Sequence, residues 1–291
     1  MPDKFTATWV SHSSISDWLK CPRSYYLKNV YRDPKTKHKI QLMAPPLALG
    51  SAVHEVIESL SVLPTKERFN ESLIKKFQTA WKKVSGKAGG FRDAATEEKY
   101  KLRGETMLRR VMDHPGPLLN LAVKINDDLP HYWLSEEDNI ILCGKIDWLE
   151  FLPDTDSVHI IDFKTGKNEE DSGSLQLPIY HLLVQNCQHR RVAKASYWYL
   201  DINDELTPKE LPDLAEAHNQ VLEVARQIKT ARKLERFKCP HGDDGCYACR
   251  PMEAIIQGKA EFVGLNDYKA DVYIMPEQTE AQDKTETSVL L

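Results

Sequence analysis

The sequence lacks the features that mark membrane proteins, secreted proteins and proteins that coat DNA by bulk charge. It contains no run of eighteen apolar residues, and its first residues, Met1 to Phe5, lack the basic and apolar stretches of a signal peptide. We therefore expect a cytoplasmic protein without membrane contact. With 39 basic and 43 acidic residues, the net charge of -4 excludes a histone-like polycation. No internal repeat is visible.

Cysteine is scarce, with six residues in 291, and its spacing is informative. In a reducing compartment, spaced cysteines are better interpreted as metal ligands or reactive thiols than as disulfides. Cys239, Cys246 and Cys249 cluster near the C-terminus, and Cys21 lies far upstream, so three clustered thiols and one distant thiol supply four possible ligands. The remaining two cysteines, Cys143 and Cys187, fall in a predicted strand and an apolar helix, where buried free thiols are ordinary.

The length and composition of the chain are sufficient for a large folded domain followed by a charged C-terminal segment. A length of 291 residues with 41% hydrophobic residues can bury a substantial core. From residue 266 onward, six acids face two lysines, whereas residues 1–265 carry 37 of each sign. We expect one folded domain over 1–265 and an acidic, disordered tail over 266–291.

The N-terminal half has the periodicity of helices. Ser14 with Asp17 resembles a helix N-cap, and Pro22 is expected to end that helix just after Cys21. Apolar residues at helical spacing predict further helices over 50–60, from Pro64-Thr65 through Trp81, and over 96–114. This helical part is expected to span about 13–115.

The period then changes to that of strands. Residues 131–134, 139–151 and 158–164 are rich in β-branched and aromatic side chains, and Leu152-Pro-Asp-Thr-Asp-Ser joins the last two as a hairpin turn. A helix over 175–188, a strand over 195–200 and a long helix over 211–234 follow. The order predicts an α/β fold: a catalytic core over about 118–235 with a central mixed sheet, then the cysteine cluster over 239–249.

One predicted strand carries an acid and an amine side by side. Alternate side chains share a face of a strand, so Asp162 and Lys164 point the same way. If the preceding strand pairs antiparallel, Asp147 lies near Asp162, and two converging carboxylates require a cation such as Mg²⁺ or Mn²⁺. Taken alone, Asp-x-Lys is more simply an ion pair, with Asp147 capping a turn.

A wider set of residues favours the chemical interpretation. His54 lies on a predicted helix, where it neighbours Glu58, and Gln176 and Tyr180 lie one turn apart on another. Together with Asp147, Asp162 and Lys164, this pattern resembles the PD-(D/E)XK nuclease superfamily, specifically the RecB/AddB-like branch that includes the CRISPR-associated iron-sulfur exonucleases. The resemblance spans roughly residues 13–249. Ile146 stands where the family name has proline.

The resemblance implies a restriction-endonuclease-like core and a function for each motif residue. His54, Asp147, Asp162 and the carbonyl of Phe163 would hold Mg²⁺ or Mn²⁺. Lys164 would orient the attacking water and offset charge on the scissile phosphate. Gln176 and Tyr180 match the accessory motif near DNA. The implied activity is a deoxyribonuclease, an exonuclease of DNA repair, recombination or mobile-element processing.

For the cysteines, the resemblance implies a structural 4Fe-4S cluster held by Cys21, Cys239, Cys246 and Cys249. In that branch the third C-terminal cysteine follows the Cys-x2-Cys pair, whereas here Cys239 precedes it and Ile255 stands near the usual position. A four-cysteine zinc site, a zinc site in which His241 replaces Cys239, and unligated thiols therefore remain alternatives.

Two basic stretches flank the proposed cluster. Seven basic residues lie between Lys20 and Lys39 and six between Arg226 and Lys238, each stretch with one acid. With Tyr25, Tyr26 and Tyr31 interleaved, they suit single-stranded DNA or DNA with single-stranded ends, although solvated helix faces explain single lysines equally well. A helicase or recombination protein is a candidate partner. The alternatives are a DNA-binding or helicase-partner module with vestigial catalysis, and a zinc-stapled interaction protein.

Overall fold

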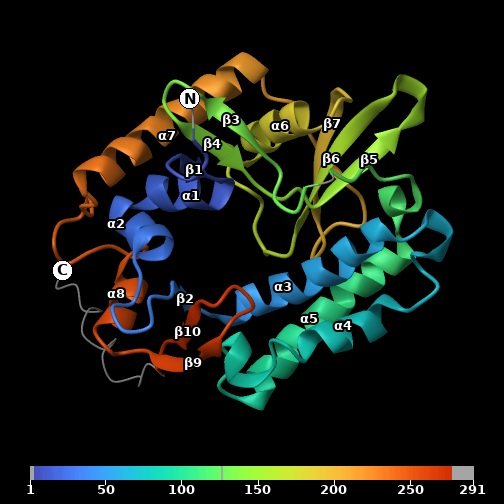
Figure 1. Cartoon of the computed structure of the whole chain (residues 1–291). Helices are drawn as coiled ribbons and strands as arrows, with labels where there is room; N and C mark the ends of the chain where they lie inside the picture. Colours follow the sequence, from blue (N-terminus) through green and yellow to red (C-terminus); the bar gives the residue numbers. More distant parts are fainter. Residues whose placement is uncertain (1–2, 126, 277–291) are drawn as a thin grey trace, which may run out of the picture.

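The computed structural model describes residues 3–125 and 127–276 and divides them into two helical layers, two central sheets and a small C-terminal sheet (Figure 1). The strands are β1 (Thr8–Val10), β2 (Ile40–Leu42), β3 (His131–Ser135), β4 (Ile140–Cys143), β5 (Trp148–Leu152), β6 (Ser157–Lys164), β7 (Val192–Tyr199), β8 (Thr207–Lys209), β9 (Glu261–Leu265) and β10 (Asp271–Ile274). The main helices are α1 (His12–Lys20), α2 (Pro22–Tyr25), α3 (Pro45–Glu58), α4 (Leu73–Trp81), α5 (Ala94–Asp113), α6 (Gln176–Cys187), α7 (Leu214–Leu234) and α8 (Arg250–Ile256). This is the mixed α/β class expected of a restriction-endonuclease-like fold.

The four-stranded sheet has the order β5-β6-β7-β8 and is mixed. Strands β5 and β6 form the expected antiparallel hairpin, with Trp148 opposite Ile161. Strand β7 is parallel to β6 and is reached through α6, and β8 closes the edge antiparallel to β7. The β6–α6–β7 crossover brings the carboxyl end of β6 and the start of α6 close together, which is where the polar motif residues fall.

Alternation along β5, β6 and β7 builds two separate cores. Ile160 and Tyr197 face one side of the sheet and pack with apolar residues of α6 and α7. Ile161, Phe163 and Trp198 face the other side and pack with α3, α4 and α5. Figure 1 shows these two helical layers on opposite sides of the sheet. Both faces of β6 are therefore buried, which explains its nearly continuous apolar run.

Three expected element boundaries are wrong, each for a local reason. Ser11 rather than Ser14 is the N-cap of α1, because its side chain accepts from the Ser14 backbone N–H while the Ser14 hydroxyl accepts from the Ser11 N–H. Thr65–Glu67 is only a short 3-10 turn, and α4 begins at Leu73. The predicted strand over 139–151 is interrupted between β4 and β5, so β4 joins a separate sheet of order β1-β4-β3.

The predicted disordered tail also begins too early. Residues Asp271–Ile274 form β10, which pairs parallel with β2 and antiparallel with β9. The acidic composition predicted disorder, but Asp271 is buried. Its carboxylate accepts from the Thr36 hydroxyl at 2.5 Å and lies 2.8 Å from the Nδ1 of His38. Residues 277–291 of the expected tail lie outside the described residues. Within residues 3–125 and 127–276, no helix is long and apolar enough to cross a membrane.

Candidate functional site

The polar motif residues come from three places around the end of β6. Asp162, Phe163 and Lys164 end that strand, Asp147 lies just before β5, and His54 lies on α3. Antiparallel pairing of β5 with β6 carries Asp147 next to Asp162, and the Asp147 Oδ2 accepts from the Phe163 backbone N–H at 2.9 Å. The sequence-predicted residues His54, Asp147, Asp162 and Lys164 therefore converge.

Helix α3 approaches this strand end closely because it carries glycine at position 50. A Cβ at Gly50 would lie 3.2 Å from the Oγ1 of Thr165, the residue after β6. One turn further along α3, the Nδ1 of His54 lies 3.4 Å from the Oδ2 of Asp147 and 3.8 Å from the Oε1 of Glu58. Ligand atoms of His54, Glu58 and Asp147 all lie within 4.8 Å of one another.

The charges in this group are strongly coupled. Burial favours a neutral imidazole at position 54, but the carboxylates of Asp147 and Glu58 outweigh it and raise the pKa of His54 to about 10. Burial, followed by the charge of Asp147, raises the pKa of Asp162 to about 7, although Lys164 opposes this shift. The site thus brings carboxylates close together, and a proton on His54 partly balances their negative charge.

Lys164 is held at three points. Its Nζ lies 3.0 Å from the Oδ2 of Asp162 and 2.9 Å from the Oε2 of Glu170, and it donates to the Oε1 of Gln176. Burial disfavours its charge, but Asp162 and Glu170 outweigh burial and raise the pKa of Lys164. The amine is therefore a charged group with a fixed position.

Gln176 and Tyr180 complete the constellation from the first turns of α6. The Nε2 of Gln176 donates to the Oδ1 of Asp162 at 2.8 Å and to the Tyr180 hydroxyl at 3.2 Å. Gln176 and Tyr180 are both buried, and the ring of His12, the first residue of α1, lies 6.5 Å from that of Tyr180. Gln176 thus contacts the acid of β6 directly, and Tyr180 is linked to that acid through Gln176.

The donor set fits a divalent cation. Asp147 and Asp162 are carboxylates close enough that the charge of Asp147 helps to raise the pKa of Asp162, and the buried Oδ2 of Asp162 is balanced by the ion pair with Lys164. Carboxylate oxygens suit Mg²⁺, and an added imidazole is acceptable to Mn²⁺. The three residues whose ligand atoms lie within 4.8 Å of one another are His54, Glu58 and Asp147, without Asp162. The structure therefore adds Glu58 to the predicted ligand candidates.

Sequence reasoning did not assign Glu58 or Glu170. Glu58 was recognisable, because it stands four residues after His54 and therefore shares its helix face. Glu170 was not, because it lies in the polar segment between β6 and α6, whose path alone brings it to Lys164. That path is set in part by the Glu170 backbone N–H, which donates to the Tyr199 hydroxyl at 3.1 Å.

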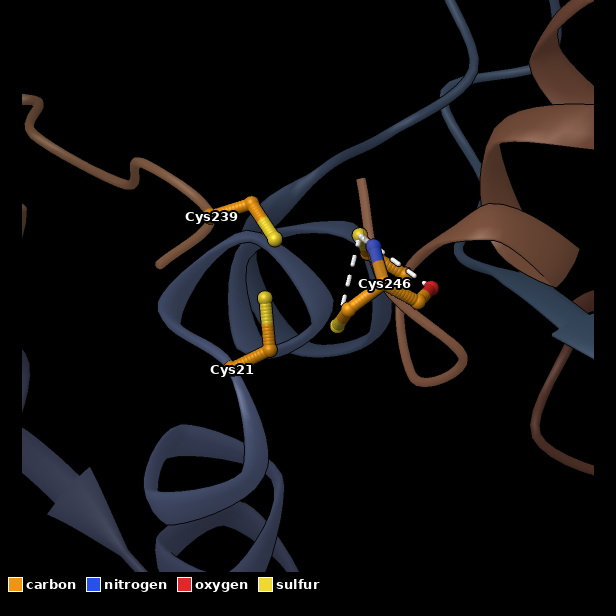
Figure 2. Close-up of side chains that lie close together, drawn as sticks. Cys21, Cys239 and Cys246 are labelled. Atoms are coloured by element: carbon orange, nitrogen blue, oxygen red, sulfur yellow. Dashed lines mark hydrogen bonds between the residues drawn. The ribbon is translucent and has the colours of Figure 1, made fainter. Parts of the chain in front are cut away.

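The four cysteines form a second, separate cluster. Cys21, Cys239, Cys246 and Cys249 are buried, and their sulfurs all lie within 4.8 Å of one another. In Figure 2 the labelled side chains of Cys21, Cys239 and Cys246 point toward a common centre. Cys143 and Cys187 lie outside this cluster, and the Cys143 thiol donates to the Val10 carbonyl at 3.4 Å.

The cysteine environment favours metal binding. Burial opposes ionisation, but the backbone N–H groups of Ala248 and Cys249 outweigh it and lower the pKa of Cys246 to about 6. Burial raises the pKa of Cys21 to about 12 and raises that of Cys249. A cation would allow all four to ionise, since coordinating thiols are deprotonated. His241 touches the cluster through its backbone N–H, which donates to the Cys239 sulfur.

A family model described as the PD-(D/E)XK nuclease superfamily matches residues 9–253, which includes the whole polar constellation and all four clustered cysteines. No curated protein matches the chain.

Proposed function

Because the chain belongs to the PD-(D/E)XK nuclease superfamily, we propose that it is a metal-dependent nuclease that hydrolyses phosphodiester bonds in DNA. The observation that carries this proposal is the convergence of His54, Asp147 and Asp162 beside a fixed, charged Lys164. A family match alone would not distinguish an active enzyme from a relic. The intact set favours an enzyme.

The more specific proposal is an exonuclease of the RecB/AddB-like branch that acts on single-stranded DNA or single-stranded ends. Two features support it beyond the family match. Gln176 on α6 donates to Asp162 and to the Tyr180 hydroxyl, as an accessory motif would, and a cysteine cluster joins the N-terminal helices to the C-terminal segment. A role in repair, recombination or mobile-element processing, a helicase partner and a cytoplasmic location stay predictions.

In this proposal His54, Asp147, Asp162 and the Phe163 carbonyl hold Mg²⁺ or Mn²⁺, with Glu58 as an additional candidate. The cation would act as a Lewis acid on the scissile phosphate. His54 must release its proton to bind, since ligands are deprotonated when they coordinate. The hydrogen bond from the Phe163 N–H to Asp147 fixes the orientation of that carboxylate.

Lys164 supplies the positive charge that the chain itself contributes to the reaction. Its ammonium can donate to the attacking water and offset charge that develops on the phosphate. Asp162 and Glu170 hold the amine in place, so little reorganisation is needed when charge develops. Gln176 links the amine to Asp162 and to Tyr180, and thereby fixes the relative positions of all three groups.

We propose that the cysteine cluster holds a structural metal centre. The family resemblance favours a 4Fe-4S cluster. The sulfur spacing favours zinc, because a tetrahedral ion with bonds of about 2.3 Å to sulfur sets sulfurs about 3.8 Å apart, and Cys246 and Cys249 are 3.8 Å apart. Iron, sulfide and zinc analysis of anaerobically purified protein, with absorption near roughly 400 nm as the mark of iron-sulfur, decides between them.

The nuclease proposal is tested with end-labelled single- and double-stranded DNA and Mn²⁺. Wild-type protein is expected to shorten the labelled strand, and the products reveal polarity and strand preference. Asp162→Ala is expected to abolish cleavage while the thermal unfolding midpoint stays that of a folded protein. Asp154→Ala, at the exposed far end of the same hairpin, is the matched control and should cleave normally.

The vestigial alternative makes the opposite prediction. A module without catalysis would bind the same DNA and leave it intact with every divalent ion. Cleavage by Asp162→Ala at the wild-type rate would show that the proposed site is wrong even if the protein is a nuclease.

A further inference from the structure

A groove beside the cysteine cluster lies outside the candidate active site. It has a volume of about 850 Å³ and lies between the α2 region, the C-terminal end of α7 and α8. Both basic stretches recognised in the sequence contribute to it: Arg23 from the first, and Arg232, Arg236 and Lys238 from the second. The fold thus brings two stretches that are remote in sequence to one concave surface.

The charge of the groove is mostly unbalanced. Among its lining cations, Arg23 is tied to Glu253 and also donates to the Asp243 carbonyl at 3.0 Å. Within the described residues, Arg232, Arg236 and Lys238 form no ion pair, and Glu235 is the one further acid in the lining. All three cations are exposed. Unpaired cations that converge on a concave surface attract an anionic ligand.

The floor of the groove is aromatic. The Phe237 ring stacks on that of Tyr26 at a centroid distance of 4.9 Å and on that of Tyr25 at 6.2 Å. Tyr26 and Phe237 line the groove and are partly exposed. Exposed Ile256 adds apolar surface at the rim. Any polyanion could bind the arginines, but only a ligand that also has flat apolar groups could stack on these rings.

We infer that this groove binds a segment of single-stranded DNA, with phosphates on Arg232, Arg236 and Lys238 and a base against the Tyr26–Phe237 pair. Single strands combine regular negative charge with unpaired bases, and cationic grooves with aromatic rings are the usual means of binding them. An acidic peptide would match the charge but would leave the rings without a stacking partner. The inference deepens the proposed nuclease function and rests on it.

The groove is placed to hold the same strand that reaches the active site. Helix α1 begins at His12, beside Tyr180, and ends where Cys21 enters the cluster that forms the adjoining core. Its nine residues span about 13 Å. A strand of several nucleotides would contact both sites.

The inference is tested by binding of fluorescein-labelled oligothymidylates of four and twenty-four nucleotides, with Ca²⁺ in place of Mn²⁺. Phe237→Leu keeps an apolar side chain beside Tyr25 but removes a stacking ring, so it should weaken 24-mer binding by about fivefold or more. Arg236→Gln should weaken it too and reduce the salt slope by about 0.7. Lys233→Gln, the same charge change on a neighbouring residue outside the groove, is the matched control and should change little.

Cleavage assays separate this inference from the nuclease proposal. If both hold, the groove variants raise KM for the 24-mer and leave cleavage of the 4-mer unchanged. If the wild type cleaves nothing, the nuclease proposal fails, but the binding assay still decides the groove. Wild-type affinity for the 24-mer in both groove variants, or equal losses with Lys233→Gln, would overturn the inference. The inference would also be overturned if the groove variants lost affinity for an acidic peptide but kept wild-type affinity for the 24-mer.

Discussion

At the residue scale, substitution of Lys164 distinguishes an active enzyme from a protein with vestigial catalysis. The amine contacts Asp162, Glu170 and Gln176, so its position is fixed, but it is not placed to ligate a cation. Lys164→Ala should reduce single-turnover cleavage by roughly 100- to 1,000-fold, as is typical when one positioned electrostatic group is lost. Mn²⁺ binding, measured by calorimetry, should persist, whereas Asp147→Ala should weaken it.

Glu170 provides the companion measurement. Glu170→Gln keeps the size of the side chain but removes the charge that holds Lys164 2.9 Å away. A positioning role predicts a lower single-turnover rate with an unchanged KM, and recovery in Glu170→Asp. Near wild-type cleavage by Lys164→Ala would contradict this account and favour the binding-module alternative.

At the element scale, the contact between α4 and α5 depends on glycine. A Cβ at Gly104 would lie 2.3 Å from the Cζ of Phe77 and 3.0 Å from the Cδ1 of Leu49. Phe77 is fully buried and cannot move aside freely. Overpacking of this kind costs about 1–3 kcal/mol, and the better helix propensity of alanine returns up to about 1 kcal/mol. Gly104→Ala should therefore lower the free energy of unfolding in urea.

A second glycine provides the control for this prediction. Gly173 lies in the segment between β6 and α6. A Cβ at this position would lie 3.7 Å from its nearest neighbour, the Oδ1 of Asp171, which is an ordinary van der Waals contact. Gly173→Ala should leave the free energy of unfolding almost unchanged. Equal stability of Gly104→Ala and the wild type would mean that α4 and α5 do not pack as described.

The β5–β6 hairpin contains a buried polar network whose stability depends on pH. Glu150 on β5 lies opposite His159 on β6, with Oε2 2.8 Å from the Nδ1 of His159, and the Asn120 amide donates to its Oε1 at 2.6 Å. The Nε2 of His159 lies 2.8 Å from the Ser196 hydroxyl. Burial opposes ionisation, but the hydrogen bonds from His159 and Asn120 outweigh it and lower the pKa of Glu150.

A lowered carboxyl pKa fixes the sign of the pH effect. The folded state holds the Glu150 proton less tightly than the unfolded chain, so this contribution is present above the unfolded pKa of about 4.3 and is lost as pH falls through the lower folded pKa. Glu150→Gln should flatten the decline in the free energy of unfolding between about pH 5 and 3. The same change at exposed Glu223 should leave the slope as in the wild type.

At the scale of the whole molecule, the cysteine cluster closes the chain on itself. Cys21 and Cys239 are 218 positions apart, yet their sulfurs lie within 4.8 Å of one another. A metal centre that closes so long a loop restricts the unfolded chain strongly. Cys21→Ser should therefore lose bound metal and lower the unfolding midpoint by several degrees. Cys187→Ser, outside the cluster, should keep both the metal and the midpoint.

The active site and the cluster should respond independently to these changes. Asp162→Ala should keep the metal of the cysteine cluster, because the two sites share no ligand. Full metal content in Cys21→Ser would show that Cys21 is not a ligand.

The sequence by itself determined the features that follow from local pattern. Alternation placed Asp162 and Lys164 on one side of β6, and the Leu152–Ser157 turn identified the hairpin. One-turn spacing placed Gln176 with Tyr180, and cysteine spacing predicted a cluster of four thiols from two ends of the chain, which the structure brings together. These signals survive because strand and helix periods depend on neighbouring residues alone.

Only the tertiary structure decided the features that depend on distant contacts. The path of the segment between β6 and α6 brings Glu170 to Lys164, and no local pattern specifies that path. Acidic composition predicted disorder at Asp271, but pairing with β2 and contacts with Thr36 and His38 make it part of a strand. The two basic stretches form one groove because α7 ends against the α2 region. Long-range packing overrides composition wherever a charged or polar segment finds partners far along the chain.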